Sequence, residues 1–191
     1  MSQAQRLVDT ISTQYLLKKH QEDKIRTLYD LCQNLSVGGK IVELGSYHGM
    51  STCALCLSST TEVYAIDDYS NKFGWAGEEY KESDLTVFNM RTKALGARPI
   101  LINKDANLAR KSLNLPISLI FWDLGVRNRL TMDFKLWQDL IIKGGMFAVH
   151  DLPTGILGSN MLRYIIDVEK IYGWQFVKEY PANIRVFVKN G

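Results

Sequence analysis

The sequence predicts an α/β fold in which helices cover both faces of a mostly parallel sheet. Short apolar segments alternate with segments of helical periodicity, an order typical of parallel β-α-β units. Near the C-terminus, two apolar segments are joined by residues 180–183 alone, and so short a connection can link only antiparallel neighbours. We therefore expect five parallel strands followed by an antiparallel hairpin, all in one seven-stranded sheet.

The N-terminal region has the pattern of helices, because apolar residues recur at intervals of three and four between Leu7 and Leu35. The polar segment 20–23 is expected to separate two helices. Residues 1–36 are thus predicted to be a helical extension of a single domain that spans residues 1–191.

The remaining elements follow in alternation. Strands are expected at residues 41–44, 63–66, 99–102, 118–122 and 146–149, and the hairpin at 174–178 and 185–188. Helices are expected at residues 51–58, 78–94, 106–112, 130–142 and 162–172.

Composition limits the classes of function. A chain of 191 residues with 46% hydrophobic residues can bury a sizeable core. The net charge of +3 is small and its basic residues are dispersed, which argues against a nucleic-acid partner. No apolar run has the length of a membrane span, and the N-terminus lacks the apolar core of a signal peptide.

Cysteine usage favours a reducing compartment. The three residues Cys32, Cys53 and Cys56 cannot all pair within one chain, so we expect a cytoplasmic protein. Cys53 and Cys56 lie one turn apart on an expected helix, without the second pair of ligands that a zinc site needs. Core packing is the favoured interpretation for both.

The segment 40–52 carries the clearest functional signal. An apolar run ends near Glu43, a loop contains Gly45 and Gly49, and a helix begins directly afterwards. This strand, loop and helix N-terminus form the place where open α/β sheets hold nucleotides. The next apolar run ends in Asp67, whose carboxylate can accept hydrogen bonds from both hydroxyls of a ribose.

The spacing of the glycines indicates which nucleotide is bound. A dinucleotide site needs Gly-x-Gly-x-x-Gly, but Tyr47 stands where a diphosphate would approach bare backbone. Glu43 would repel phosphate and attract a cation. The pattern therefore favours S-adenosylmethionine, a nucleoside without phosphate that carries an ammonium and a sulfonium group.

The pattern Glu-x-Gly-x-x-x-Gly with Asp67 downstream resembles motifs one and two of the class I S-adenosylmethionine-dependent methyltransferases. Val-Glu-Leu-Gly-Ser-Tyr-His-Gly-Met-Ser-Thr and Tyr-Ala-Ile-Asp look most like methyltransferase family 24, the small-molecule O-methyltransferases related to cephalosporin and macrolide biosynthesis enzymes. The resemblance runs from about residue 35 to the C-terminus and implies a Rossmann-like methyltransferase fold.

The resemblance also implies a set of cofactor-binding residues along the strand ends. They are Glu43, Gly45, Ser46, Tyr47, Gly49, Ser51, Asp67, Asp68, Tyr69, Asp105, Ala106 and Asp123. Two interpretations of Asp105 stay open, because it could cap the following helix, lie beside the adenine, or do both.

Methyl transfer to a hydroxyl requires a base, and His150 at the end of the fifth strand is the best candidate, with Asp123 nearby. His48 is its competitor, although shaping the loop is the favoured role for it. The segment 68–77, rich in aromatic residues and glycine, could be a lid over the cofactor and acceptor or an ordinary surface loop.

A divalent metal ion such as Mg²⁺ could replace the base, since the resembling group holds one with acids after the fourth and fifth strands. Asp123 and Asp151 match those positions. However, the group often reads Asp-Gly-Asp-His-x-Tyr, whereas this chain reads Asp-Leu-Gly-Val-Arg-Asn from Asp123 onward. The second acid and the histidine are missing, so catalysis could have been altered or lost.

The sequence therefore predicts methyl transfer from S-adenosylmethionine to a hydroxyl of a small molecule or sugar. The alternatives are a nicotinamide-dependent (NAD(P)) oxidoreductase and a catalytically altered binding protein with the methyltransferase fold. We expect a small-molecule acceptor and no nucleic acid or membrane partner. The N-terminal helices could either seal the acceptor pocket or pair two subunits in a homo-oligomer.

Overall fold

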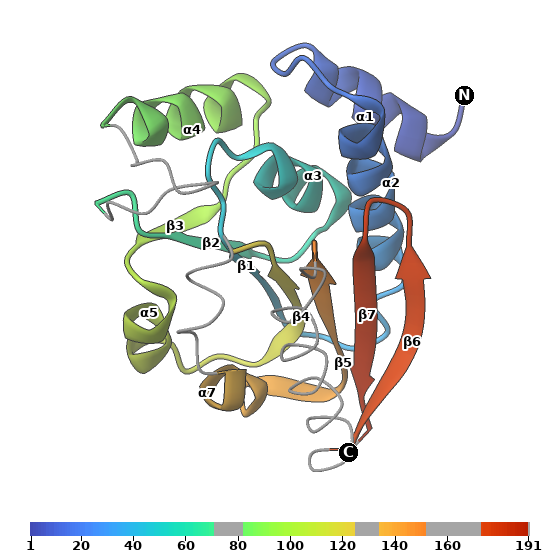
Figure 1. Cartoon of the computed structure of the whole chain (residues 1–191), viewed down its shortest axis with the longest axis vertical. Coiled ribbons are helices and arrows are strands. Elements are labelled where there is room, and N and C mark those ends of the chain that lie inside the picture. The colour runs from blue at the N-terminus through green and yellow to red at the C-terminus, as the bar shows by residue number, and fades with distance from the viewer. Residues whose placement is uncertain (71–81, 125–133, 152–172, 191) are drawn as a thin grey trace.

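The computed structural model describes residues 1–70, 82–124, 134–151 and 173–190, and it contains a seven-stranded sheet in the order β3-β2-β1-β4-β5-β7-β6 (Figure 1). The strands are β1 (Lys40–Leu44), β2 (Val63–Asp67), β3 (Ile100–Asn103), β4 (Ile117–Trp122), β5 (Ile141–His150), β6 (Trp174–Tyr180) and β7 (Ile184–Lys189). The helices are α1 (Gln3–Ser12), α2 (Lys19–Gln33), α3 (Met50–Ser58), α4 (Glu82–Ala94), α5 (Ala106–Ser112) and α7 (Phe134–Gln138).

The pairing of the strands confirms the predicted mixed sheet. β1 to β5 pair in parallel, while β7 pairs antiparallel with both β5 and β6. β1 lies between β2 and β4, so the chain runs outward to β3 on one side of β1 and to the later strands on the other. In open α/β sheets, the crevice outside this switch point is where ligands bind.

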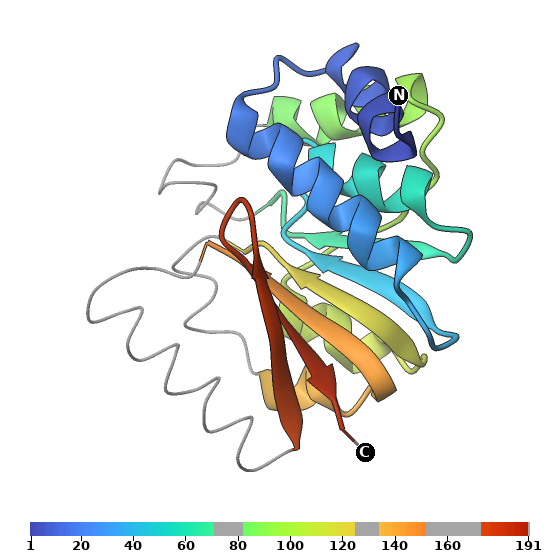
Figure 2. The ribbon, with the colours of Figure 1, turned by 90° about the vertical axis from the view of Figure 1, so that its right-hand side faces the viewer.

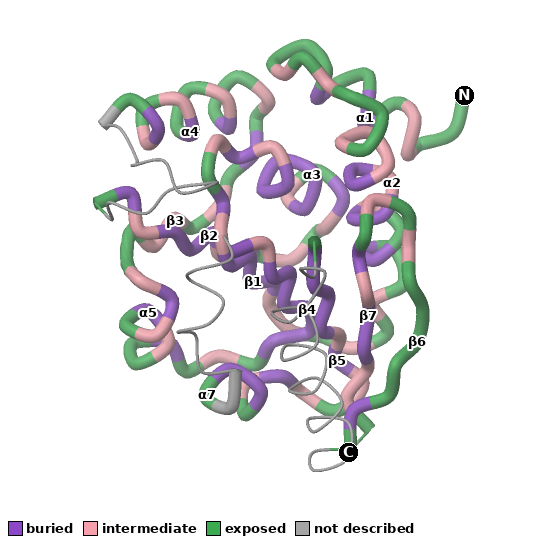
Figure 3. The backbone as a smooth tube through the Cα atoms, in the orientation of Figure 1, coloured by how far each residue is buried: buried purple, intermediate pink, exposed green. Residues whose placement is uncertain are grey.

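Helices cover both faces of the sheet because the buried strands send alternate side chains to opposite sides (Figures 2 and 3). Ile41, Phe121 and Ala148 pack in one core together with residues of α1, α2 and α3. The neighbouring residues Val42 and Trp122 pack on the other face, in a core that includes residues of α5 and α7. The same alternation decides on which face the polar side chains at the strand ends lie.

Two predicted boundaries are wrong. The break between the N-terminal helices lies after α1 ends at Ser12 and before α2 begins at Lys19, so the segment 20–23 lies within the first two turns of α2. The side chain of Gln21 accepts a hydrogen bond from the backbone N–H of Lys18, 2.8 Å away, and thereby satisfies a donor at the helix start. The polar run therefore begins a helix instead of ending one.

The second error concerns the expected helix 130–142. α7 ends at Gln138 and β5 already begins at Ile141, because Gly144 and Gly145 form an irregularity within the strand rather than a turn before it. Ile141 pairs with Ile117, and regular pairing resumes with Met146 opposite Leu119. The expected helix 162–172, together with residues 78–81 and 130–133, lies outside the described residues.

Among the described helices, none is both long and apolar enough to span a membrane. All three cysteines are free thiols, and Cys53 and Cys56 lie on α3 and pack in the core shared with α2, as expected.

Candidate functional site

The site forms where the carboxyl ends of β1, β2, β4 and β5 meet. Gly45, in the loop after β1, has φ of 92°, and a Cβ atom on it would lie only 2.6 Å from the carbonyl oxygen of Asp123. Its own N–H donates to the carbonyl of Ile66, 2.8 Å away. Glycine is therefore required here, because the loop between β1 and α3 passes in direct backbone contact with the ends of both neighbouring strands.

The predicted ribose ligand Asp67 lies against this glycine loop and is almost fully buried, with 4% of its surface exposed. One carboxylate oxygen accepts the backbone N–H of Tyr47 at 2.7 Å, and the other accepts the N–H of Asp68 at 2.9 Å. A carboxylate oxygen can accept more than one hydrogen bond, so holding the loop is compatible with binding a ribose.

Tyr69, one of the predicted cofactor-binding residues, supports the glycine loop through its hydroxyl. Its hydroxyl donates to the carbonyl of Tyr47 at 2.5 Å and lies 3.1 Å from the hydroxyl of Ser46. Its ring packs against Phe88 of α4, and burial raises its pKa above the usual range of a tyrosine. Asp68 makes a local turn by accepting bonds from the N–H and hydroxyl of Ser70. Residues 71–77 of the expected lid lie outside the described residues.

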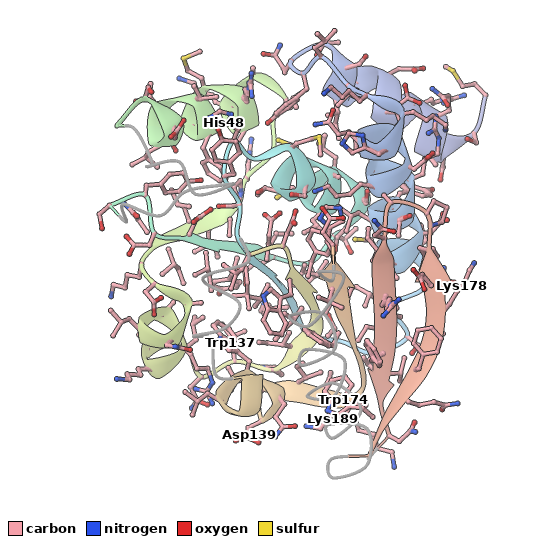
Figure 4. The ribbon with its side chains drawn as sticks, viewed as in Figure 1. His48, Trp137, Asp139, Trp174, Lys178 and Lys189 are labelled. Atoms are coloured by element: carbon pink, nitrogen blue, oxygen red, sulfur yellow. The ribbon has the colours of Figure 1, made fainter. Side chains whose placement is uncertain are left out.

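His48 shapes the loop through three contacts. The Nε2 atom of His48 lies 2.7 Å from a carboxylate oxygen of Asp84, a residue of α4. Figure 4 shows the labelled His48 beside this helix. Its ring stacks on Tyr47 with 3.8 Å between centroids, and its carbonyl accepts a 2.7 Å hydrogen bond from the hydroxyl of Tyr15. Sequence reasoning missed Tyr15 and Asp84, because more than thirty residues separate each of them from His48.

Glu43 lies beneath the loop, fully buried, instead of lining it. The hydroxyl of Thr52 on α3 donates to its carboxylate. Burial raises the pKa of Glu43 to about 8, although the hydroxyls of Ser51 and Thr52 favour the ionised form. This shift favours the neutral carboxylic acid, which opposes the expectation that Glu43 supplies negative charge to the pocket. Its observed role is to join β1 to the start of α3.

Asp105 caps α5, which confirms one of its two interpretations. A single carboxylate oxygen accepts the backbone N–H groups of Asn107 at 2.9 Å and Leu108 at 3.2 Å. These are two of the N–H groups that a helix cannot satisfy itself. Contact with an adenine stays a prediction for Asp105 and for the buried Ala106 that follows it.

His150 and Asp123 form a hydrogen-bonded pair at the ends of β5 and β4. His150 Nδ1 lies 2.7 Å from Asp123 Oδ1, and the histidine side chain is only 9% exposed. Within the described part of the chain, Nε2 of His150 has no hydrogen-bond partner. If Nδ1 carries the proton that Asp123 accepts, Nε2 presents a lone pair and can act as a base.

The other oxygen of Asp123 is held by a residue that sequence reasoning missed. Lys24 of α2 extends its side chain to the end of β4, where its Nζ lies 2.7 Å from Asp123 Oδ2. Burial alone would raise the pKa of Asp123, but Lys24 and His150 outweigh it and hold the pKa well below its usual range. The carboxylate is thus a firmly ionised bridge between a lysine and a histidine.

These contacts do not suit the predicted metal site. Both oxygens of Asp123 are engaged, one of them by an ammonium group that would repel a second cation. The side chain of Asp151 is 59% exposed, with its nearer oxygen 3.5 Å from His150 Nδ1. Across the four described ranges there is no group of three or more His, Cys, Asp or Glu side chains that could hold a metal ion.

Comparisons with known proteins agree with this architecture. A family model described as a methyltransferase domain matches residues 42–152, which contain the glycine loop, Asp67, Asp123 and His150. No curated protein sequence matches the chain.

Several solved structures share the fold at low sequence identity. An rRNA methylase from Streptococcus thermophilus has a TM-score of 0.66 and 19% identity, covering 93% of this chain and 100% of that one. An O-methyltransferase from Streptomyces achromogenes, involved in tomaymycin synthesis and solved with S-adenosylmethionine, has a TM-score of 0.66 and 13% identity over 100% and 91%. An O-methyltransferase from Bacillus cereus, solved with S-adenosylhomocysteine, has a TM-score of 0.65 and 15% identity over 99% and 92%.

Proposed function

The chain belongs to the methyltransferase domain family, and from this premise we propose that it transfers a methyl group from S-adenosylmethionine to a hydroxyl of a small molecule. Membership of this family disfavours the nicotinamide-dependent alternative. The solved structures that bind S-adenosylmethionine or S-adenosylhomocysteine in the same fold support the choice of cofactor.

The residues around the glycine loop fit such a cofactor. Asp67 is the group suited to the ribose, because its carboxylate lies at the carboxyl end of β2 beside the loop. Gly45 and Gly49 both have positive φ, and a Cβ atom would lie only 2.6 Å from the Asp123 carbonyl oxygen at Gly45 and 3.0 Å from the Phe88 ring at Gly49. Tyr47 lies between them, 37% exposed, where the diphosphate of a dinucleotide would need bare backbone.

The observation that carries the proposed reaction is the 2.7 Å contact between His150 and Asp123. When bound, the cofactor supplies a methyl group on a sulfonium, which is already an activated leaving group. Nε2 of His150 would take the proton of the acceptor hydroxyl, so that its oxygen could receive that methyl group. Asp123 accepts a hydrogen bond from the Nδ1–H group of His150, and thereby fixes the tautomer and stabilises the imidazolium.

Calorimetry with S-adenosylhomocysteine tests the cofactor part of the proposal. We expect Asp67→Ala to weaken binding by at least about tenfold, since it removes charge-assisted hydrogen bonds worth roughly 1.5–3 kcal/mol. Asp30→Ala is the control, because Asp30 is an exposed acid on α2 and does not belong to the predicted cofactor-binding residues. Equal affinities of Asp67→Ala and Asp30→Ala would reject the assignment.

The base is tested with a panel of small hydroxyl compounds, with S-adenosylhomocysteine formation measured by mass spectrometry. His150→Ala should lower kcat by about 10²–10⁴-fold, the usual contribution of a general base. Full turnover by this variant would remove His150 from that role.

A second candidate is a binding protein that keeps the fold without catalysis. It is favoured by the missing acid and histidine after Asp123. This candidate predicts that the wild-type chain binds S-adenosylhomocysteine weakly or not at all and transfers no methyl group to any compound of the panel.

A further inference from the structure

Lys24 is a buried cation that reaches the site from outside the matched methyltransferase region. Only 8% of the surface of Lys24 is exposed. A lysine is rarely buried to this degree unless it has a partner of opposite charge. The side chain passes the ring of Phe121, with Nζ 6.0 Å from the ring centroid, and ends on Asp123 Oδ2. The N-terminal helices thus supply a positive charge at the end of β4.

The charges around Lys24 explain why this ammonium is tolerated. Asp123 carries the full negative charge beside it, while His150 holds the other oxygen of that carboxylate. Burial raises the pKa of the nearby carboxyl of Glu43 to about 8 and so favours its neutral form, and the carboxylate of Asp151 is largely exposed to solvent. Lys24 and Asp123 therefore form a nearly neutral pair within hydrogen-bond distance, as buried charges require.

This pair engages the carboxylate on which the predicted metal site depends. A hard cation takes about six oxygen ligands, and a site built on acids must offer unshared carboxylate oxygens. Here the carboxylate after β4 is shared between an ammonium and an imidazole, and the sequence lacks a second acid directly after it. The chemistry of the donor set and the charge of Lys24 both oppose a metal ion.

We propose that Lys24 is a built-in cation that takes the place of a divalent metal ion on Asp123, so that methyl transfer by this chain is independent of metal. Only the second part of this proposal, the metal independence of methyl transfer, rests on the proposed function. Lys24 acts as a positioning residue: it fixes the Asp123 carboxylate, and that carboxylate orients the ring of His150. The N-terminal extension is then part of the active site and not only a cover over the sheet.

Binding of Mn²⁺, followed by electron paramagnetic resonance and calorimetry, tests the first clause without any activity measurement. Lys24→Met should bind Mn²⁺ at least about tenfold more tightly than the wild type, because it removes a like charge at contact distance from the carboxylate. Lys24→Arg should keep the weak binding of the wild type. Lys19→Met is the matched control, since Lys19 lies on the same helix with its side chain 75% exposed.

The Mn²⁺ bound by Lys24→Met should disappear in the double variant Lys24→Met, Asp123→Asn. Equal Mn²⁺ affinity of the wild type and Lys24→Met would overturn the proposal, and so would a tight Mn²⁺ site in the wild type. The wild-type measurement keeps the proposal falsifiable even if Lys24→Met fails to fold.

Activity tests the second clause. Wild-type turnover should be unchanged by a metal chelator and by added Mg²⁺, and Lys24→Arg should retain more activity than Lys24→Met. Loss of turnover in the chelator would overturn metal independence. Failure of the proposed function is recognised separately, because a chain that is no methyltransferase would not bind S-adenosylhomocysteine, whereas the Mn²⁺ comparison would still give its result.

Discussion

Substitution of Gly45 by alanine tests whether the approach of the glycine loop to β4 determines both stability and binding. The added Cβ atom would lie 2.6 Å from the carbonyl oxygen of Asp123, 2.8 Å from its carbonyl carbon and 2.9 Å from the backbone nitrogen of Leu124. All three are backbone atoms, so no rotation of a side chain can relieve the contacts. The loop or the end of β4 must move instead.

The magnitude follows from a comparison of three glycines. A positive φ costs an alanine about 1–2 kcal/mol, and displacement of packed backbone adds roughly 1–3 kcal/mol. Against this, alanine lowers the entropy of the unfolded chain and so stabilises by about 0.4–1 kcal/mol. Gly96 has φ of 70° with nothing within 4 Å of a Cβ atom, and Gly38 has open space without a positive φ.

We therefore expect three different results from chemical denaturation. Gly38→Ala should be neutral or slightly stabilising, and Gly96→Ala should lose up to about 1.5 kcal/mol. Gly45→Ala should lose about 3 kcal/mol, which for a chain of this size lowers the melting temperature by roughly 6–12 °C. It should also weaken binding of S-adenosylhomocysteine, because the displaced backbone belongs to Asp123. If Gly45→Ala were as stable as Gly96→Ala, the reasoning would be refuted.

Two further predictions concern carboxyl groups that the structure buries or engages. Asp105→Ala should lower the free energy of unfolding by about 1 kcal/mol, since it leaves two N–H groups at the start of α5 without their cap; a loss no greater than that of Asp30→Ala would contradict the cap. Glu43→Gln should change how stability depends on pH. The folded pKa of about 8 lies above the ordinary 4.5, so the folded chain retains a proton that the unfolded chain releases, and the wild type loses stability as pH rises through this interval. Denaturation of both proteins across that interval should show the advantage of Glu43→Gln growing with pH, and a constant difference would show that Glu43 is ionised in the folded chain.

The sheet was predictable because each of its strands has a local signal. The apolar runs ending near Glu43, Asp67 and Asp123 are short and bounded by polar residues, and buried parallel strands have that pattern. Reliance on local patterns also explains why the predicted start of β5 is wrong, since Gly144 and Gly145 look like a turn in the sequence. Only pairing with β4, which no local pattern contains, makes that segment a strand.

The site was predictable to the level of residue types and strand ends, but not to the level of contacts. The predicted strand end of Glu43 is correct. Its charge could not be predicted, because the sequence does not show how deeply a side chain is buried. Complete burial changes the preferred protonation state of Glu43, while the equally acidic Asp123 stays ionised beside Lys24. The charge of an acid at a strand end therefore depends on neighbours that are distant in the sequence.

Lys24 shows which sequence signal would have revealed the missing cation. It precedes Leu28 by four residues and Leu31 by seven, so it belongs to the stripe of α2 that faces the core. Placing a helix break at residues 20–23 concealed this, because Lys24 then stood at a helix end where a charged side chain reaches solvent. On a continuous helix, a lysine within an apolar stripe must find a buried acid. The strand ends offered several acids, among them Glu43, Asp67 and Asp123, and only the three-dimensional arrangement selects Asp123.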